Sequence, residues 1–262
     1  MRILNYAQFK RLIRGVDLEY RITGYPISLE KKARFEDLHI PYDLNFFKCK
    51  FQSLEFKNCI FSGNVTLDHT VCQALQFTGC QLQNIILKDS TLDTLGVEDS
   101  REIRKLDVYN VEINTVKLEN NPIFQELSLG CKNKIRKCWI LDQGSTSINS
   151  FQTSVYLCPE QFESFVLKNI STDVLHIGTF GNYSKLSLAN IQSDYVVFEN
   201  CSTDTSSIEI FDLKSNKFNQ GQIHFVNTAF DANVFKIKDL RPYFSTQIHH
   251  QKINIESLLA KV

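Results

Sequence analysis

The residues with the clearest potential for chemistry gather between positions 131 and 154, where four cationic side chains stand near the only tryptophan of the chain. Lysine and arginine side chains can hold a phosphate, and an aromatic ring beside them can stack on a base. A solvated, irregular turn without a ligand explains the same composition, and four cations in a neutral chain are a weak signature of nucleic-acid binding. As candidate contact residues we take these side chains and two tyrosines expected at the surface: Lys132, Lys134, Arg136, Lys137, Trp139, Tyr109 and Tyr183.

Three of the eight cysteines occupy equivalent positions of a sequence repeat described below. Cys59 and Cys80 would lie in adjacent coils about 5 Å apart, close enough for a disulfide or for a shared metal ion. The equivalent positions of neighbouring coils hold other small residues, which indicates a column limited by size rather than by chemistry. No Cys-x-x-Cys pair exists, so the usual zinc spacing is missing and we expect no metal. The small residues are Cys59, Cys80 and Ser100 in one column and Cys49, Thr70 and Ser90 in the other.

The histidines do not form a recognisable ligand set or catalytic group. His249 and His250 are adjacent, which places their rings on opposite sides of an extended chain. His69, beside Asp68, and His176 fall at or near strand positions that we expect to face solvent. No motif ties a serine to a histidine and an aspartate, and neither Gly-x-Gly-x-x-Gly nor Gly-Lys-Ser/Thr occurs. We therefore predict neither catalytic residues nor a cofactor.

The densest cluster of mixed charge is formed by Asp99, Arg101, Glu102 and Arg104. Secreted β-helical enzymes that cleave polysaccharides use carboxylates and basic residues along one strand face. Here the cluster coincides with a one-residue slip in the repeat, so an exposed turn with ion pairs is the better interpretation.

Composition limits the possible partners and compartments. Lysine plus arginine equals aspartate plus glutamate, at 29 each, so the net charge is zero and gives no general attraction to nucleic acid or to an anionic membrane. The hydrophobic content of 43% and the 20 phenylalanines provide ample core material. No apolar run is long enough for a membrane span or a secretory signal. We expect a cytoplasmic protein with reduced thiols.

The elements that must position these residues follow from an apolar residue at every fifth position, as in the series Phe77, Leu82, Leu87, Leu92 and Val97. This step matches neither the 3.6-residue period of a helix nor the two-residue period of a strand. It predicts a chain that turns a corner every five residues and stacks coil on coil. The clearest unit has ten residues: apolar, any, apolar, any, then Asn, Asp or Gly followed by a small residue. We place unit starts at 33, 44, 54, 65, 75, 85, 95, 106, 116, 127, 155, 165, 175, 186, 196, 208, 223 and 235.

Each unit is expected to contain two short extended segments with a corner between them. The apolar pair points inward because alternate side chains share a face. The Asn or Asp marks the bend, since a short polar side chain tolerates unusual backbone angles. Two units make one coil, and coils stack about 4.8 Å apart, so about ten coils produce a rod with a continuous core.

The stretch Phe56-Lys57-Asn58-Cys59-Ile60-Phe61 resembles the pentapeptide-repeat family, whose copies favour a small residue, then Asn or Asp, then Leu or Phe. The resemblance covers residues 33–125 well and 155–240 loosely, and it implies a right-handed β-helix. The chain departs from the family because the position two before the inward apolar residue alternates between large and small residues. A regular square coil is therefore expected to be distorted.

Two other repeat folds fit the pattern less well. Leucine-rich repeats also contain Leu-x-Leu followed by Asn, but with one strand per 20–29 residues and with the Asn one position later. Left-handed hexapeptide helices need a period of six, which the sequence lacks. The predicted class is thus an all-β, right-handed parallel β-helix.

The predicted organisation has three parts. Residues 1–32 form an N-terminal cap, with a helix over 1–15 and a strand over 16–23. Residues 33–240 form the repeat array, interrupted by an irregular loop at 131–154 and by shorter breaks at 201–207 and 214–221. Residues 241–262 form a C-terminal cap, with a short helix at 256–261.

The predicted function is a non-enzymatic, rigid binding solenoid that acts as scaffold, adaptor or inhibitor of another protein. Two alternatives stay open. The first is a carbohydrate-active β-helix enzyme, against which the missing export signal and missing carboxylate pair count. The second is an inhibitor that mimics DNA, as some pentapeptide-repeat proteins do, against which the zero net charge counts. A homo-oligomer is possible, and neither membrane nor nucleic acid is expected as partner.

Overall fold

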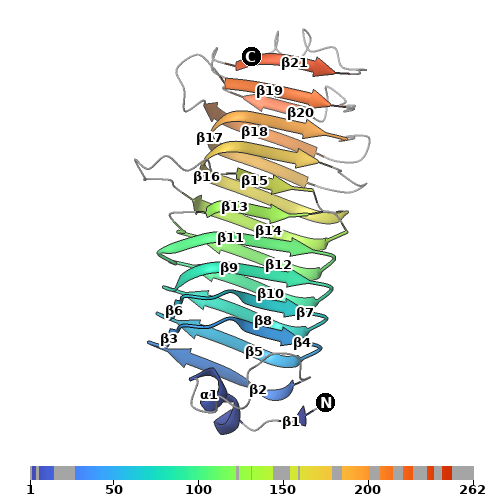
Figure 1. The fold of residues 1–262 in the computed structure, drawn as a ribbon. Helices are drawn as coiled ribbons and strands as arrows, with labels where there is room; N and C mark the ends of the chain where they lie inside the picture. The colour runs from blue at the N-terminus through green and yellow to red at the C-terminus, as the bar shows by residue number, and fades with distance from the viewer. Residues whose placement is uncertain are drawn as a thin grey trace.

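The protein winds into a parallel β-solenoid with a short helix at its N-terminal end (Figure 1). The computed structural model describes residues 2–3, 6–14, 27–121, 124–130, 132–143, 154–158, 160–178, 185–200, 207–214, 221–226, 235–238 and 244–249. Their elements are β1 (Arg2–Ile3), α1 (Tyr6–Ile13), β2 (Ile27–Glu36), β3 (His39–Ile40), β4 (Leu44–Phe47), β5 (Lys50–Lys57), β6 (Ile60–Phe61), β7 (Val65–Asp68), β8 (Val71–Thr78), β9 (Gln81–Lys88), β10 (Thr91–Glu98), β11 (Glu102–Tyr109), β12 (Glu112–Glu119), β13 (Phe124–Leu129), β14 (Lys134–Gln143), β15 (Ser154–Leu157), β16 (Gln161–Gly178), β17 (Lys185–Glu199), β18 (Ser207–Lys214), β19 (Gly221–Val226), β20 (Phe235–Lys238) and β21 (Phe244–His249).

Two ladders of paired residues run along the solenoid, one on each side of the coil, and every pairing between described strands is parallel. The first ladder joins Ala33, Leu54, Leu75, Leu95, Val116, Cys138, Phe165, Leu186, Ile208 and Phe235. The second ladder joins Leu44, Val65, Ile85, Leu106, Leu127, Val155, Leu175, Val196, Ile223 and Thr246. All the predicted unit starts lie on these ladders. The predicted class, an all-β parallel solenoid of stacked coils, is confirmed.

The five-residue period has a direct structural cause. In β9 the side chains of Leu82, Ile85 and Leu87 are completely buried, whereas Gln83 and Asn84 between them both point outward. Two successive outward residues mean that the strand turns a corner there, since alternation would otherwise bring one of them inside. The inward steps of three and two residues add up to the observed five. Equivalent positions of the coils between Ile27 and Phe198 form one continuous apolar core.

The bends between strands contain residues in the left-handed region, as the Asn/Asp/Gly positions predict. Asn58 has a φ of 53°, Gly79 of 64° and Asp99 of 52°. Asparagine and aspartate adopt this region more readily than other residues with a side chain. Neighbouring bends are also linked: Asn120 Nδ2 donates to Asp99 Oδ1 at 3.1 Å, one coil away.

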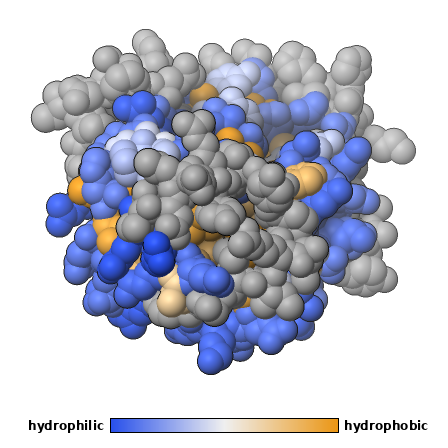
Figure 2. Space-filling view, turned by 60° about the horizontal axis from the view of Figure 1, so that its bottom comes forward, coloured by the Kyte–Doolittle hydropathy of each residue, from blue (hydrophilic) through white to orange (hydrophobic). Residues whose placement is uncertain are grey.

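The N-terminal helix closes one end of the core. Phe9 of α1 is fully buried, and its ring lies 5.6–6.3 Å from those of Phe35, Phe46 and Phe51. The Tyr42 hydroxyl donates to the last-turn carbonyl of Ile13 at 2.6 Å. Seen from this end, the described surface is mainly hydrophilic, with hydrophobic atoms showing between the polar groups (Figure 2).

Several predicted boundaries are wrong. The helix is shorter than 1–15, because Arg2 and Ile3 pair with β2 as strand β1. The array does not end at 240, because β21 continues the second ladder beside β19. The expected strand at 16–23 and helix at 256–261 lie outside the described residues.

The largest error concerns the irregular loop at 131–154. Residues 134–143 of that range form the regular strand β14, which pairs with β12 on one side and β16 on the other. Ile135, Cys138 and Ile140 point into the core with the same spacing as Leu82, Ile85 and Leu87 in β9. Residues 144–153 lie outside the described part of the chain.

Candidate functional site

Four of the predicted basic and aromatic residues lie on the outside of one strand rather than in a loop, namely Lys134, Arg136, Lys137 and Trp139. Because Ile135, Cys138 and Ile140 face the core, the side chains between them must face outward. We call the resulting surface the β14 band. It consists of Lys132, Lys134, Arg136, Lys137 and Trp139, together with Tyr109.

The charges of the band differ in how they are balanced. Arg136 Nε lies 3.0 and 2.9 Å from the two carboxylate oxygens of Glu163 on β16, so this cation is paired. Lys134 and Lys137 are exposed, and neither forms an ion pair with another described residue. Lys137 is flanked in register by Thr115 below and Ser164 above, two short side chains that leave it projecting from the sheet. These two lysines are thus available to an incoming anion.

Trp139 lies at the other end of the band and is half-buried. Its register neighbours are Lys117 on β12 and Val166 on β16. Lys117 Nζ is 2.6 Å from Glu119 and 3.1 Å from Glu98, and hydrogen bonds to these carboxylates raise its pKa. The indole therefore sits between an apolar side chain and a neutralised cation.

The band continues around the bend that precedes β14. Lys132 has a φ of 65°, and its ammonium group lies 5.9 Å from the centre of the Tyr109 ring. Tyr109 is 43% exposed, at the end of β11 on the adjoining side of the coil. The structure therefore places six of the seven predicted contact residues along one band, with a direct contact between Lys132 and Tyr109. The seventh, Tyr183, lies outside the described residues.

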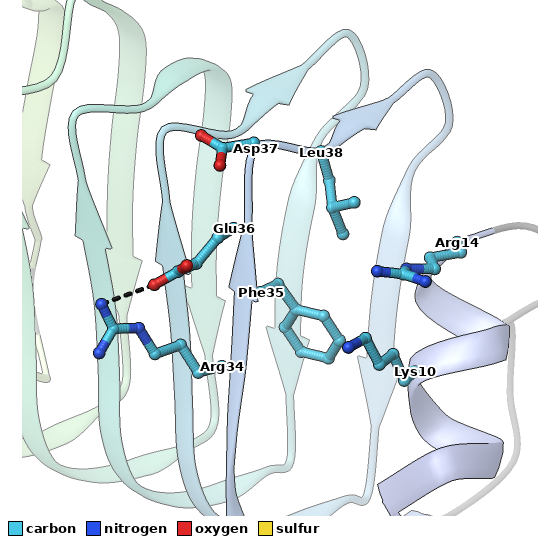
Figure 3. Close-up of a pocket in the computed structure, with 7 residues that line it drawn as sticks. All are labelled: Lys10, Arg14, Arg34, Phe35, Glu36, Asp37 and Leu38. Carbon is cyan, nitrogen blue, oxygen red and sulfur yellow. Dashed lines mark ion pairs between the residues drawn. The ribbon is translucent and has the colours of Figure 1, made fainter.

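Figure 3 shows a pocket that the sequence did not indicate, between α1 and the first coil. Its cavity volume is about 540 Å³, and Lys10 and Arg14 project from α1 towards Phe35 and Leu38. Arg34 and Glu36 form an ion pair at 2.6 Å along another wall. With Asp37 also present, the lining carries three cations and two carboxylates, so no single ligand chemistry is favoured.

The small-residue column is confirmed as a structural feature. Cys49, Thr70 and Ser90 follow one another, and each hydroxyl accepts the backbone N–H of the residue one coil below. Cys59 and Cys80 are fully buried and do not form a disulfide. Cys59 Sγ donates to the carbonyl of Lys57 at 3.3 Å, and Cys80 Sγ donates to that of Phe56 at 3.4 Å. The neighbouring Cys59 thiol and burial raise the pKa of Cys80.

Of the mixed-charge cluster, Asp99 and Arg101 lie at a bend as predicted, whereas Glu102 and Arg104 belong to strand β11. Arg104 lies 3.7 Å from Glu102 on the same strand, and Asp99 accepts a hydrogen bond from Asn120. Neither contact brings two carboxylates together as a pair for acid–base catalysis.

Among described residues, one set of three possible metal ligands has all its ligand atoms within 4.8 Å of one another: Asp68, His69 and Asp89. His69 Nδ1 is 2.5 Å from Asp68 and 4.0 Å from Asp89. Asp89 also lies 3.8 Å from Lys88 Nζ and accepts a hydrogen bond from Asn110. The ligand atoms are thus already engaged with one another on an exposed bend.

No model of a protein family, no curated protein and no solved structure matches this chain. Within the described residues, no helix has the length and apolar character required to cross a membrane. The site must accordingly be interpreted from its own geometry.

Proposed function

We propose that the protein is a non-enzymatic binding solenoid, and that the β14 band is the surface on which it holds a partner protein. The observation that carries the proposal is the arrangement of Lys134, Lys137 and Trp139 along the outside of a single strand, around its corner at Arg136 and Lys137, with the strand fixed on both sides by parallel pairing. The partner would present carboxylates to the two lysines and an apolar side chain to the indole.

The physical advantage of such a surface is preorganisation. The backbone under the three side chains is already ordered, so binding costs only side-chain entropy, about 0.5–1.5 kcal/mol for each immobilised long side chain. Tryptophan is enriched among residues that dominate interface energies, and peripheral lysines raise association rates with acidic surfaces. The band therefore fits an acidic protein surface with an apolar centre.

The same reasoning supports the finer interpretation of the fold and its setting. The alternating inward steps of three and two residues, with Asn or Asp at the bends, favour a diverged pentapeptide-type helix, and parallel crossovers are right-handed in about 98% of cases. A cytoplasmic setting remains our proposal from the reduced thiols.

DNA mimicry is the weaker alternative. A duplex carries about one negative charge per 1.7 Å of its axis. In the described bends neutral residues separate the acidic ones, and one row, for example, has only two acidic residues in five coils: Asp37, Asn58, Gly79, Asp99 and Asn120. This row is far too dilute in charge to replace a phosphate backbone.

The test is a comparison of binding partners between matched variants. Lys134→Glu combined with Lys137→Glu reverses the two unpaired cations of the band. Lys50→Glu combined with Lys57→Glu makes the same change on β5, on the same side of the solenoid and four rungs away, about 19 Å. Proteins captured from the native lysate by each tagged variant are quantified by mass spectrometry at low and at moderate salt.

We expect a stoichiometric protein that binds the native chain and the β5 variant, is lost from the β14 variant, and binds more weakly as salt increases. A partner retained equally by both variants would remove the β14 band from the interface. A native chain that captures no protein above background would contradict the binding function itself.

A further inference from the structure

A second cluster of chemically active side chains lies on the other ladder of the solenoid, around Gly178. In the described registers Leu157 pairs with Ile177, and Gly178 pairs with Glu199. Cys158, Gly178 and Glu199 therefore follow one another up three coils at equivalent positions. His176 lies two residues before Gly178 on the same outward face of β16.

Gly178 creates the space in which these groups meet. A Cβ atom at this position would lie 2.9 Å from Cys158 Sγ and 3.6 Å from His176 Nε2. It would also lie 3.3 Å from the backbone carbonyl of Glu199. Any larger residue would consequently push the thiol and the imidazole apart.

The imidazole nitrogen in this cluster has an unusual environment. His176 Nε2 is buried and has no hydrogen-bond partner, although Glu199 Oε2 lies only 3.0 Å away. The Tyr156 ring, 5.8 Å from that of His176, packs against the imidazole from the coil below. Burying a nitrogen without a hydrogen bond is unfavourable, so its position calls for a physical reason.

We propose that Cys158, His176 and Glu199 bind a divalent transition-metal ion of the zinc class. A thiolate, an imidazole and a carboxylate are three of the ligand types that zinc prefers, and three protein ligands leave a fourth position for water. Two ligand atoms about 2.0–2.2 Å from one tetrahedral ion lie about 3.4 Å apart, close to the observed separation of Nε2 and Oε2. Two lone pairs directed at a shared cation also explain why these atoms approach without a hydrogen bond.

Binding requires a small adjustment, because the three ligand atoms are not all within 4.8 Å of one another in the structure. Rotation of the Cys158 or Glu199 side chain into the space over Gly178 brings them together. Glu199 is partly exposed, so its carboxylate can turn. The Asp68, His69 and Asp89 set is tighter but offers no thiol.

This cluster was not predicted from the sequence. Cys158 and His176 are 18 residues apart and Glu199 follows 23 residues later, so no short motif connects them. Only the stacking of coils places them on three successive rungs. The inference does not depend on the β14 band, which lies on the first ladder.

The test is a titration of the reduced, chelator-treated full-length protein with Co²⁺, followed by displacement with Zn²⁺. We expect one equivalent of Co²⁺ to bind, with a sulfur-to-metal charge-transfer band that identifies a thiolate ligand. Cys158→Ser should abolish that band, and His176→Gln or Glu199→Gln should weaken affinity at least about tenfold. Gly178→Ala should also reduce binding, because the added methyl group fills the position where the metal and its ligands meet.

Two matched variants separate this site from others. Cys72→Ser removes a buried thiol elsewhere in the array and His69→Gln removes the imidazole of the bend cluster, and neither should change Co²⁺ binding. Failure to bind Co²⁺ or Zn²⁺ would overturn the proposal, as would binding that survives in both Cys158→Ser and His176→Gln. Loss only in His69→Gln would overturn it too and assign the metal to the bend. If Cys158→Ser does not fold by circular dichroism, Glu199→Gln, at a partly exposed position, decides the question.

Discussion

The column of stacked phenylalanine rings in the first coils offers a quantitative test of how the solenoid is held together. Phe77 is completely buried, and its ring lies 5.4 Å from that of Phe56 at an interplanar angle of 11°. Phe56 in turn stacks on Phe35 at 5.2 Å, while Phe61 meets both Phe56 and Phe77 edge-on. Each ring therefore contacts the coil above or below through the core.

Truncation of Phe77 to alanine removes a fully buried ring and leaves a cavity bounded by rigid strands. Substitutions of this kind cost about 3–5 kcal/mol in free energy of unfolding, out of about 5–15 kcal/mol for a typical domain. Phe56→Ala should cost at least as much, because Phe56 has ring contacts with Phe35, Phe61 and Phe77. The double variant should lose about 0.5–1.5 kcal/mol less than the sum of the single losses, the value of one stacked aromatic pair.

The free energies would be measured by urea denaturation, with circular dichroism as the signal. The control is the pair of Phe77 and Phe198. Phe198 is equally buried but lies many coils away, so the losses of these two variants should be additive. A loss below about 1 kcal/mol for Phe77→Ala would contradict its place in the core. Additive losses for Phe56 and Phe77 would show that the stacked rings do not stabilise neighbouring coils. Phe77→Asp should prevent folding altogether, because it buries an unpaired charge.

Three further predictions concern single positions of the array. Burial raises the pKa of the Cys72 thiol to about 12, above its ordinary value of 9.0. Above pH 9 the thiol therefore stays protonated in the folded protein while it ionises in the unfolded chain. The stability from this group is fully present below pH 9, and the free energy of unfolding falls by about 1.4 kcal/mol per pH unit above it. Cys72→Ala should flatten that decline in urea titrations between pH 9 and 10, and an unchanged slope would contradict the burial argument. Asn133 is completely buried, donates to the carbonyls of Val108 and Gly130 at 2.7 and 2.9 Å, and accepts the N–H of Val111 at 2.9 Å. Asn133→Ala should lower the free energy of unfolding by about 3 kcal/mol, because each buried backbone group left without its hydrogen bond costs about 1–3 kcal/mol. The control Asn114→Ala, at an exposed position, should cost well under 1 kcal/mol. Equal losses would contradict the structural role of Asn133. Asn58 has a φ of 53°, so Asn58→Val should unfold at lower temperature than Asn58→Gly by the equivalent of about 1–2 kcal/mol, and equal melting temperatures would show that the bend relaxes.

The predicted loop at 131–154 was wrong because the repeat in strand β14 was not recognised from the sequence. The inward residues Ile135, Cys138 and Ile140 repeat the spacing of other strands, which was the available signal. It was obscured by four neighbouring cations, and by Asn133 at a position where the first coils have Cys, Ser or Thr. The bend accommodates Asn133 because its side-chain amide forms hydrogen bonds with the backbone N–H of Val111 and the backbone carbonyl of Val108. A buried polar residue that satisfies its own hydrogen bonds is invisible to a rule based on size.

The candidate sites depended on tertiary structure to different degrees. The residues of the β14 band lie close in sequence, so their grouping could be predicted, but their placement on a strand face could not. The cluster of Cys158, His176 and Glu199 could not be predicted. The number of residues between them does not show that they lie one above another, and only the strand register does.

The sequence by itself determined the repeat, because an inward residue at every fifth position and an Asn, Asp or Gly at each bend are local requirements of the backbone. It therefore specified the class of fold and the residues that start the units along both ladders. Only the tertiary structure decided which distant side chains share a surface. Parallel stacking brings residues a coil apart to within about 4.8 Å, and insertions between coils change which residues those are without leaving any local mark in the sequence.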